Sequence, residues 1–310
     1  MNDRPALAVA ERAADWLIGL RAAERTDDLS LSRGTAGVLA FFLHAARAYD
    51  EPRDLAQACA AGDVLAAAIR TCLDGDLGGI AWALRELATS TGEARYAAGV
   101  RTAVDRLATA DPSPDGALAL LRLGEVELAL GQARALAAGG RPAGTAVAYA
   151  LAAVGAAAGD ADLSGAARRW AEDRRATGEL SARVPAVLAA ADPSWWETAG
   201  RLAAAARNRG VPESPFRRGG SAGLADWMLS LHHLAVAGQP VGDPAELVAF
   251  ARTLTADLTA RAVVDRAGAR WLPAETGWAR GAAGIGSWLV RFDTFEQGRE
   301  SVLRLPDSPW

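Results

Sequence analysis

Residues Thr276 to Phe292, TGWARGAAGIGSWLVRF, join a glycine-rich turn directly to an apolar segment, and this junction decides the fold. Gly281 and Gly284 stand three positions apart, which places bare backbone where side chains would not fit. The residues after them, mainly Ala, Ile, Trp, Leu and Val, have the composition of a buried helix. The stretch therefore predicts a turn that opens an inner helix.

The same pattern returns along the chain, as RGTAGV at residues 33–38, GDLGGI at 75–80 and GSAGL at 220–224. Weaker copies lie near residues 116, 146 and 186, so that the repeat spacing runs from 30 to 61 residues. Between the copies, segments such as 5–26 and 53–72 alternate apolar and charged residues with a helical period, which is typical of an outer helix with one solvated face. We expect most inner helices to end at a glycine, namely Gly92, Gly131, Gly159, Gly238 and Gly298.

Repeats of this length indicate a solenoid or a closed array. An open solenoid has polar caps at both ends, whereas the last inner helix here, IGSWLVRF, is as apolar as the others. The sequence therefore predicts an all-α fold, an α/α toroid of seven helix pairs that forms a single domain over residues 1–310. The long last spacing contains two β-favouring runs around a turn, which predicts a small β-hairpin near residues 262–272.

Composition narrows the classes of function. The chain has 310 residues, and 51% of them are hydrophobic, which is enough apolar material for a core. Its net charge of −4 gives no sign of the basic surface that binds nucleic acid. Cys59 and Cys72 lack zinc-site spacing and are expected to be buried free thiols in a reducing cytoplasm. We expect no secretory signal in the first residues, because Glu11, Arg12 and Asp15 interrupt the apolar stretch that a signal needs. The uncharged run from Pro142 to Gly159 is mostly Ala and Gly, which favours a buried helix over a membrane span.

The segments SLSRGTAGVLAFFL, GDLGGIAWALREL, GGSAGLADWML and GWARGAAGIGSWLVRF resemble the glycine repeats of the lanthionine synthetase C-like family, the cyclases of lanthipeptide biosynthesis. The resemblance covers residues 5 to about 296 and implies a seven-fold α/α barrel. It also implies the family's reaction, addition of cysteine thiols to dehydrated Ser and Thr residues of a leader-guided precursor peptide. Kinase and lyase enzymes of the same pathway would then be partners.

The chain departs from the family at the zinc site. By register, the family's three zinc ligands fall near Ser181 and on Arg218 and Gly219, none of which binds zinc, and a family histidine falls near Arg141 or Pro142. The resemblance is thus to the metal-free cyclase domains that end three-domain, kinase-bearing synthetases, and no metal or cofactor is expected. Since neither a lyase nor a kinase precedes Met1, the chain is expected to be either a stand-alone member or an excised domain.

A cyclase without zinc needs another way to stabilise a thiolate, because a free thiol is only about 3% ionised at pH 7. We expect the inner-helix N-termini to gather at one end and to favour anions there, with Arg33, Arg141, Arg218 and Arg280 adding positive charge. The proton would be moved by a carboxyl group from Asp76, Asp111, Asp115 or Glu275. By the resemblance, Asp111 or Asp115 stands where the family has an acidic residue. Trp278 is the aromatic expected to face the peptide.

Each candidate also has a structural interpretation. Arg33 and Arg280 could bond carbonyls of neighbouring loops, and the three aspartates could be helix caps or turn formers. Trp82 and Trp288 are expected in the core, and the histidines, His44, His232 and His233, are expected to be structural. Three functions therefore stay open at this point: a zinc-independent cyclase, a non-catalytic toroid that binds the leader or scaffolds partner enzymes, and an unrelated carbohydrate-active toroid. The last would need paired carboxylates, where these turns carry arginines.

Overall fold

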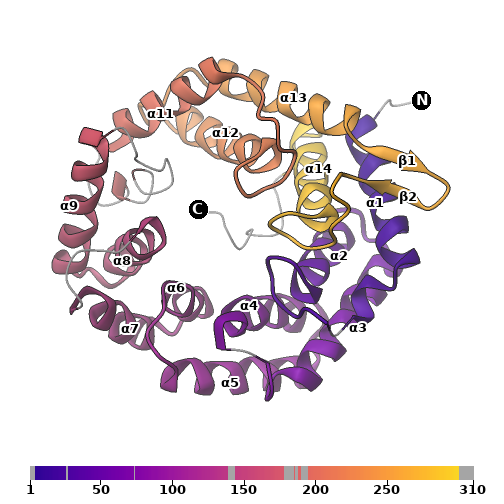
Figure 1. Cartoon of the computed structure of the whole chain (residues 1–310), viewed down its shortest axis with the longest axis horizontal. Coiled ribbons are helices and arrows are strands. Elements are labelled where there is room, and N and C mark those ends of the chain that lie inside the picture. The colour runs from indigo at the N-terminus through magenta and orange to yellow at the C-terminus, as the bar shows by residue number, and fades with distance from the viewer. Residues whose placement is uncertain are drawn as a thin grey trace.

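The computed structural model of the chain describes residues 4–25, 27–72, 74–138, 144–177, 185, 188–189 and 195–299. Within them the fold is all-α apart from one small hairpin, as the sequence predicts. Figure 1 shows the helices in two layers, an outer and an inner one, which alternate along the chain except at α9 and α11, two successive described helices of the outer layer.

The outer helices are α1 (Pro5–Gly19), α3 (Pro52–Ala68), α5 (Ala94–Thr109), α7 (Val126–Ala138), α9 (Ala161–Thr177), α11 (Trp195–Arg209) and α13 (Pro244–Ala260). The inner helices are α2 (Thr35–Tyr49), α4 (Asp74–Thr91), α6 (Pro114–Leu123), α8 (Thr145–Ala158), α12 (Ser221–Val236) and α14 (Ala282–Glu296). A 3₁₀ turn, η1 (Ala22–Glu24), links α1 to the turn before α2.

The two layers differ in how much of each helix is buried. Inner helix α2 buries thirteen of its fifteen residues, because it is apolar on every face. Outer helix α5 buries a single stripe of four residues, Tyr96, Gly99, Ala103 and Leu107, spaced three or four apart. The periodicity of the sequence thus sorts the helices between the layers.

Packing contacts follow the order of the chain and then join its two ends. Each of α2, α4, α6, α8 and α12 packs on the outer helix that follows it, and α14 packs on α1. Inner helices contact one another in the order α12, α14, α2, α4, α6 and α8. The first and last helices therefore lie side by side, as Figure 1 shows.

The predicted hairpin is confirmed. Strands β1 (Val263–Asp265) and β2 (Gly268–Arg270) pair antiparallel, with Val264 opposite Ala269, and β2 packs on α1. A Cβ on Gly268 would lie 2.3 Å from the backbone oxygen of Arg12, so the close approach of hairpin and helix requires glycine.

Helix ends agree with most of the predicted glycine stops. Gly159 has a left-handed backbone (φ 67°) directly after α8, and Gly92, Gly238 and Gly298 follow their inner helices in the same conformation. The prediction for Gly131 is wrong. Inner helix α6 ends at Gly124 (φ 88°), and Gly131 lies inside outer helix α7. None of the described helices is both long and apolar enough to cross a bilayer.

Candidate functional site

The three clear glycine turns share one backbone arrangement. They span residues 28–34 before α2, 214–220 before α12 and 275–281 before α14. In each turn the first N–H of the helix donates to a carbonyl seven residues earlier: Thr35 to Asp28 at 3.0 Å, Ser221 to Ser214 at 2.8 Å and Ala282 to Glu275 at 2.9 Å. The second N–H of each helix likewise donates to the carbonyl seven residues before it. The sequence repeat is therefore a structural repeat in these three copies, whereas the GDLGGI copy, predicted to be a turn, lies inside α4, which begins at Asp74.

This arrangement corrects the expected role of the helix N-termini. The first N–H groups of a helix bind anions only when nothing else accepts their hydrogen bonds. In α2, α12 and α14 the carbonyls of the preceding turn already accept them. The first two N–H groups of these helices are therefore not available to an anion, so an anion at this end would depend on the helix dipoles and on side chains.

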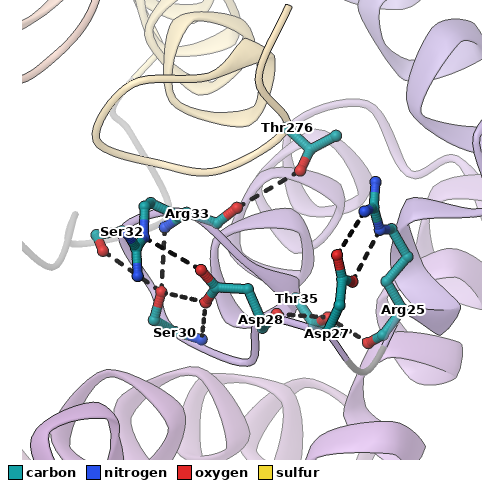
Figure 2. Close-up of polar contacts among 8 residues, drawn as sticks. All are labelled: Arg25, Asp27, Asp28, Ser30, Ser32, Arg33, Thr35 and Thr276. Carbon is teal, nitrogen blue, oxygen red and sulfur yellow. Dashed lines mark hydrogen bonds and ion pairs between the residues drawn. The ribbon is translucent and has the colours of Figure 1, made fainter.

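Backbone hydrogen bonds join the turns to one another. The N–H of Arg218 donates to Ala279 at 2.9 Å, and the N–H of Ala279 donates to Ser32 at 2.8 Å. The Thr276 hydroxyl lies 3.5 Å from the carbonyl oxygen of Arg33 (Figure 2). A Cβ on Gly277 would lie 2.2 Å from the Cα of Arg33, which explains why this position is glycine. The turns before α12, α14 and α2 thus form one continuous surface, which we call the turn face.

Three of the predicted arginines lie on the turn face. Arg33, Arg218 and Arg280 are all exposed, and Arg33 forms an ion pair with Asp28 at 3.1 Å. Within the described part of the chain, no ion pair or side-chain hydrogen bond engages Arg218 or Arg280. Arg141, the fourth predicted arginine, lies outside the described residues.

A cavity of about 270 Å³ lies beside the turn face. It is lined by Leu20, Ala22 and Arg25 in and around η1, by the turn before α2 and by residues 274–276. Both Arg33 and Glu275 line it. Figure 2 shows the polar contacts around it, in which Asp28 accepts hydrogen bonds from the Ser30 backbone and hydroxyl at 2.9 and 2.6 Å. The hydrogen bond from Arg25 lowers the pKa of Asp27. No described residue forms an ion pair or a side-chain hydrogen bond with the Glu275 carboxylate, which lines the same cavity as Arg33.

The other predicted carboxylates lie elsewhere. Asp111 and Asp115 are exposed at the start of α6, which Figure 1 places across the inner layer from α12 and α14. Neither caps the helix, because the Ser113 hydroxyl accepts the hydrogen bond from the N–H of Gly116 at 3.0 Å. Asp76 lies in the first turn of α4, and its side chain is outside the described residues. The fold therefore brings Glu275, and neither Asp111 nor Asp115, to the arginines.

Trp278 does not face outward as predicted. It is 3% exposed, and the guanidinium of Arg217 stacks 4.8 Å from its ring. Arg217 donates to Asp226 at 2.9 Å, and Arg291 from α14 also pairs with Asp226. Trp278 is thus part of the hydrophobic core, where it offers almost no surface to a peptide.

Sequence reasoning missed this buried Arg217–Asp226–Arg291 network. A sequence signal existed, since Asp226 interrupts the apolar run GLADWML at a position inside a helix. Nearby, His44 is 0% exposed, and neither ring nitrogen has a partner among the described residues. Burial, with the charges of Arg291, Arg217 and Arg47, lowers the pKa of His44 to about 3.

The positions that correspond to the family's zinc ligands carry no metal-binding group. Arg218 is a cation, Gly219 has no side chain, and residue 181 lies outside the described residues. Among the described residues, no cluster of three His, Cys, Asp or Glu side chains could hold a metal ion.

Comparison with known proteins adds no family assignment. The chain matches no protein-family model, and a search of curated proteins finds no significant match.

Proposed function

We propose that the chain is a divergent lanthionine synthetase C-like toroid whose turn face binds an acidic segment of a precursor peptide. Support for a closed toroid of seven helix pairs comes from the packing of α1 on α14 and from the alternation of outer and inner helices. The inner helix of the proposed fifth pair would fall among residues 178–194, most of which lie outside the described residues.

The observation that carries the proposal is the cluster of exposed arginines on turns that touch one another. Arg218 and Arg280 have no partner among the described residues, so their guanidinium groups are available to carboxylates without breaking an internal ion pair. Guanidinium groups bind carboxylates through two parallel N–H···O hydrogen bonds, a bidentate geometry that favours Asp and Glu side chains. Each exposed pair contributes about 0.2–1 kcal/mol, so binding should be moderate in strength and sensitive to salt.

A binding experiment tests this proposal. A fluorescein-labelled peptide with six glutamates is titrated with the protein at two salt concentrations, and a peptide with glutamine at those positions serves as the reference. We expect the glutamate peptide to bind and its affinity to fall with salt. The double variant Arg218→Ala/Arg280→Ala should bind about 2- to 30-fold more weakly, because it loses two exposed pairs. Arg101→Ala, which removes an exposed arginine on outer helix α5, is the matched control. Equal binding by the double variant and the wild type would overturn the proposal.

A second candidate, thioether ring formation without zinc, is favoured by one observation. Arg33 and Glu275 line the same cavity, and no described residue pairs with the Glu275 carboxylate. In this proposal Glu275 accepts the proton of a cysteine thiol, and the sulfur adds to the β-carbon of a dehydrated residue. Arg33 stabilises the resulting enolate until a proton returns to its α-carbon. The partners would be the dehydrated precursor with its leader and the kinase or lyase enzymes that prepare it.

Mass spectrometry separates the two candidates. A dehydrated precursor peptide from the same pathway is incubated with the protein and a chelator, and free thiols are trapped and counted. Ring formation predicts loss of thiols with the wild type and retention with Glu275→Gln. If the wild type leaves the thiols free while the acidic peptide still binds, the turn face is a binding surface only.

A further inference from the structure

A second cavity lies away from the turn face, between α1, the C-terminal half of α2, the start of α3 and α14. It has a volume of about 520 Å³, which is in the range of small-molecule sites. None of the glycine-turn residues lines it, so it is separate from the candidate site above.

The inner wall of this cavity is apolar. It is formed by Ala10, Ala14, Phe41, Ala45 and Val290, each of which is at most 4% exposed. Because three of the five side chains are alanine, the helices leave open space where larger side chains would have filled it. Such a wall fits the apolar body of a small organic molecule.

The charged groups at the rim are mostly acidic. Arg4 donates to both carboxylate oxygens of Asp293, so the positive charge of Arg4 is already neutralised. Asp293 also accepts a hydrogen bond from the Tyr49 hydroxyl at 2.7 Å. No described residue pairs with the carboxylates of Glu11 or Glu51, which line the same cavity. These two groups leave an uncompensated negative charge around the opening.

Asp54 is the acidic group inside the cavity. It is 5% exposed, and its carboxylate has a single side-chain contact among the described residues, the Nε of Arg53 at a long 3.4 Å. Arg53 is shared, because its Nη1 donates to Asp15 at 2.9 Å. Burial raises the pKa of Asp54 more than the charge of Arg53 lowers it. The fold therefore leaves a buried carboxylate with less positive charge beside it than it needs.

We propose that this cavity binds a small primary amine with an apolar body, with the ammonium group on Asp54 and the body against Phe41 and the alanines. The ammonium supplies a second positive partner for the buried carboxylate, which has only the long contact with Arg53, and the rim acids favour entry of a cation. This inference does not depend on the proposed function of the turn face.

Three probes with the same body and different heads test it: 4-phenylbutylamine, 4-phenylbutan-1-ol and 4-phenylbutanoate. Each is titrated calorimetrically into the full chain. We expect the amine to bind at least 10-fold more tightly than the alcohol or the acid. Equal binding of the three probes, tighter binding of the acid, or no binding of the amine would overturn the proposal.

Two variants locate the site. Asp54→Asn is expected to weaken amine binding at least 10-fold, whereas Asp105→Asn, an exposed aspartate on α5, should leave it unchanged. Unchanged binding by a folded Asp54→Asn protein would refute the assignment. If a thermal melt shows that this variant does not fold, Glu51→Gln tests the site instead. Glu51 is exposed at the rim, and its substitution should weaken binding of the amine a few-fold without changing binding of the alcohol. An unchanged amine affinity in Glu51→Gln would then refute it.

Discussion

His44 should make the protein lose stability in mild acid. The residue lies inside α2 with 0% exposure, neither ring nitrogen has a described partner, and its pKa in the folded protein is about 3. In the unfolded chain a histidine titrates near pH 6.5. Between these two values the unfolded state binds a proton that the folded state does not. Stability from this residue is therefore intact above pH 6.5 and is lost as the pH falls toward 3.

The size of the effect follows from the two pKa values. At pH 5 protonation of the unfolded chain at this site lowers its free energy by about 2 kcal/mol, and at pH 7 by about 0.2 kcal/mol. Lowering the pH from 7 to 5 should thus cost about 2 kcal/mol through His44 alone. That is a large part of the 5–15 kcal/mol that typically separates folded from unfolded states.

The measurement is chemical denaturation of the wild type and His44→Leu at pH 7, 6 and 5. Every other titrating group is present in both proteins, so the difference between their unfolding free energies isolates His44. We expect the leucine variant to be at least as stable at pH 7, because it removes two buried polar atoms without partners. It should gain about 2 kcal/mol on the wild type by pH 5. A difference that stays constant within about 0.5 kcal/mol would mean that His44 is hydrated or paired with an acid in solution, and the reasoning would fail.

Three further predictions concern stability and are measured by denaturant unfolding. Gly284→Ala should lower the free energy of unfolding by more than about 2 kcal/mol, because its Cβ would lie 1.8 Å from a backbone oxygen. Gly131→Ala, inside α7, should raise it by about 0.5–1 kcal/mol, because a Cβ there meets nothing within 4 Å. A similar cost for the two would contradict the turn packing. Asp226→Ala should lower the free energy of unfolding by about 3–5 kcal/mol, because it leaves two largely buried guanidinium groups without their carboxylate. The control Glu296→Gln, which breaks an exposed ion pair, should lower it by less than about 1 kcal/mol. Ser113→Ala should cost about 1 kcal/mol through loss of the α6 cap, and no change would mean that another group satisfies that N–H.

Sequence reasoning recovered the features that local residues determine. Two glycines three apart, followed by an apolar run, located the starts of α2, α12 and α14, and a following glycine located the ends of α4 and α8. The hairpin was also predicted, because β-favouring residues flank a turn there. In these cases the conformational preference of a few neighbouring residues decides the outcome.

The candidate site was harder to predict, because it depends on contacts between distant turns. Trp278 looks like a surface aromatic in its own turn, and only the stacking of Arg217 from another turn makes it a core residue. The helix N-termini look free in sequence, but each seven-residue turn folds back and supplies its own acceptors. Gly131 was assigned as a stop because the third repeat is degenerate, while Gly124 adopts the left-handed backbone that ends α6.

The contact between α1 and α14 has a consequence for how the protein is made. The ion pair at the start of α1 joins Arg4 to Asp293, which are 289 positions apart. Ribosomes add about 5–20 residues per second, so the first helix leaves the ribosome roughly 15–60 s before its packing partner is synthesised. During that interval Ala10, Ala13 and Leu17, which are at most 2% exposed in the folded protein, have no surface to cover them. A nascent chain therefore exposes the apolar stripe of α1 until α14 is synthesised, and this is the kind of surface that holdase chaperones bind.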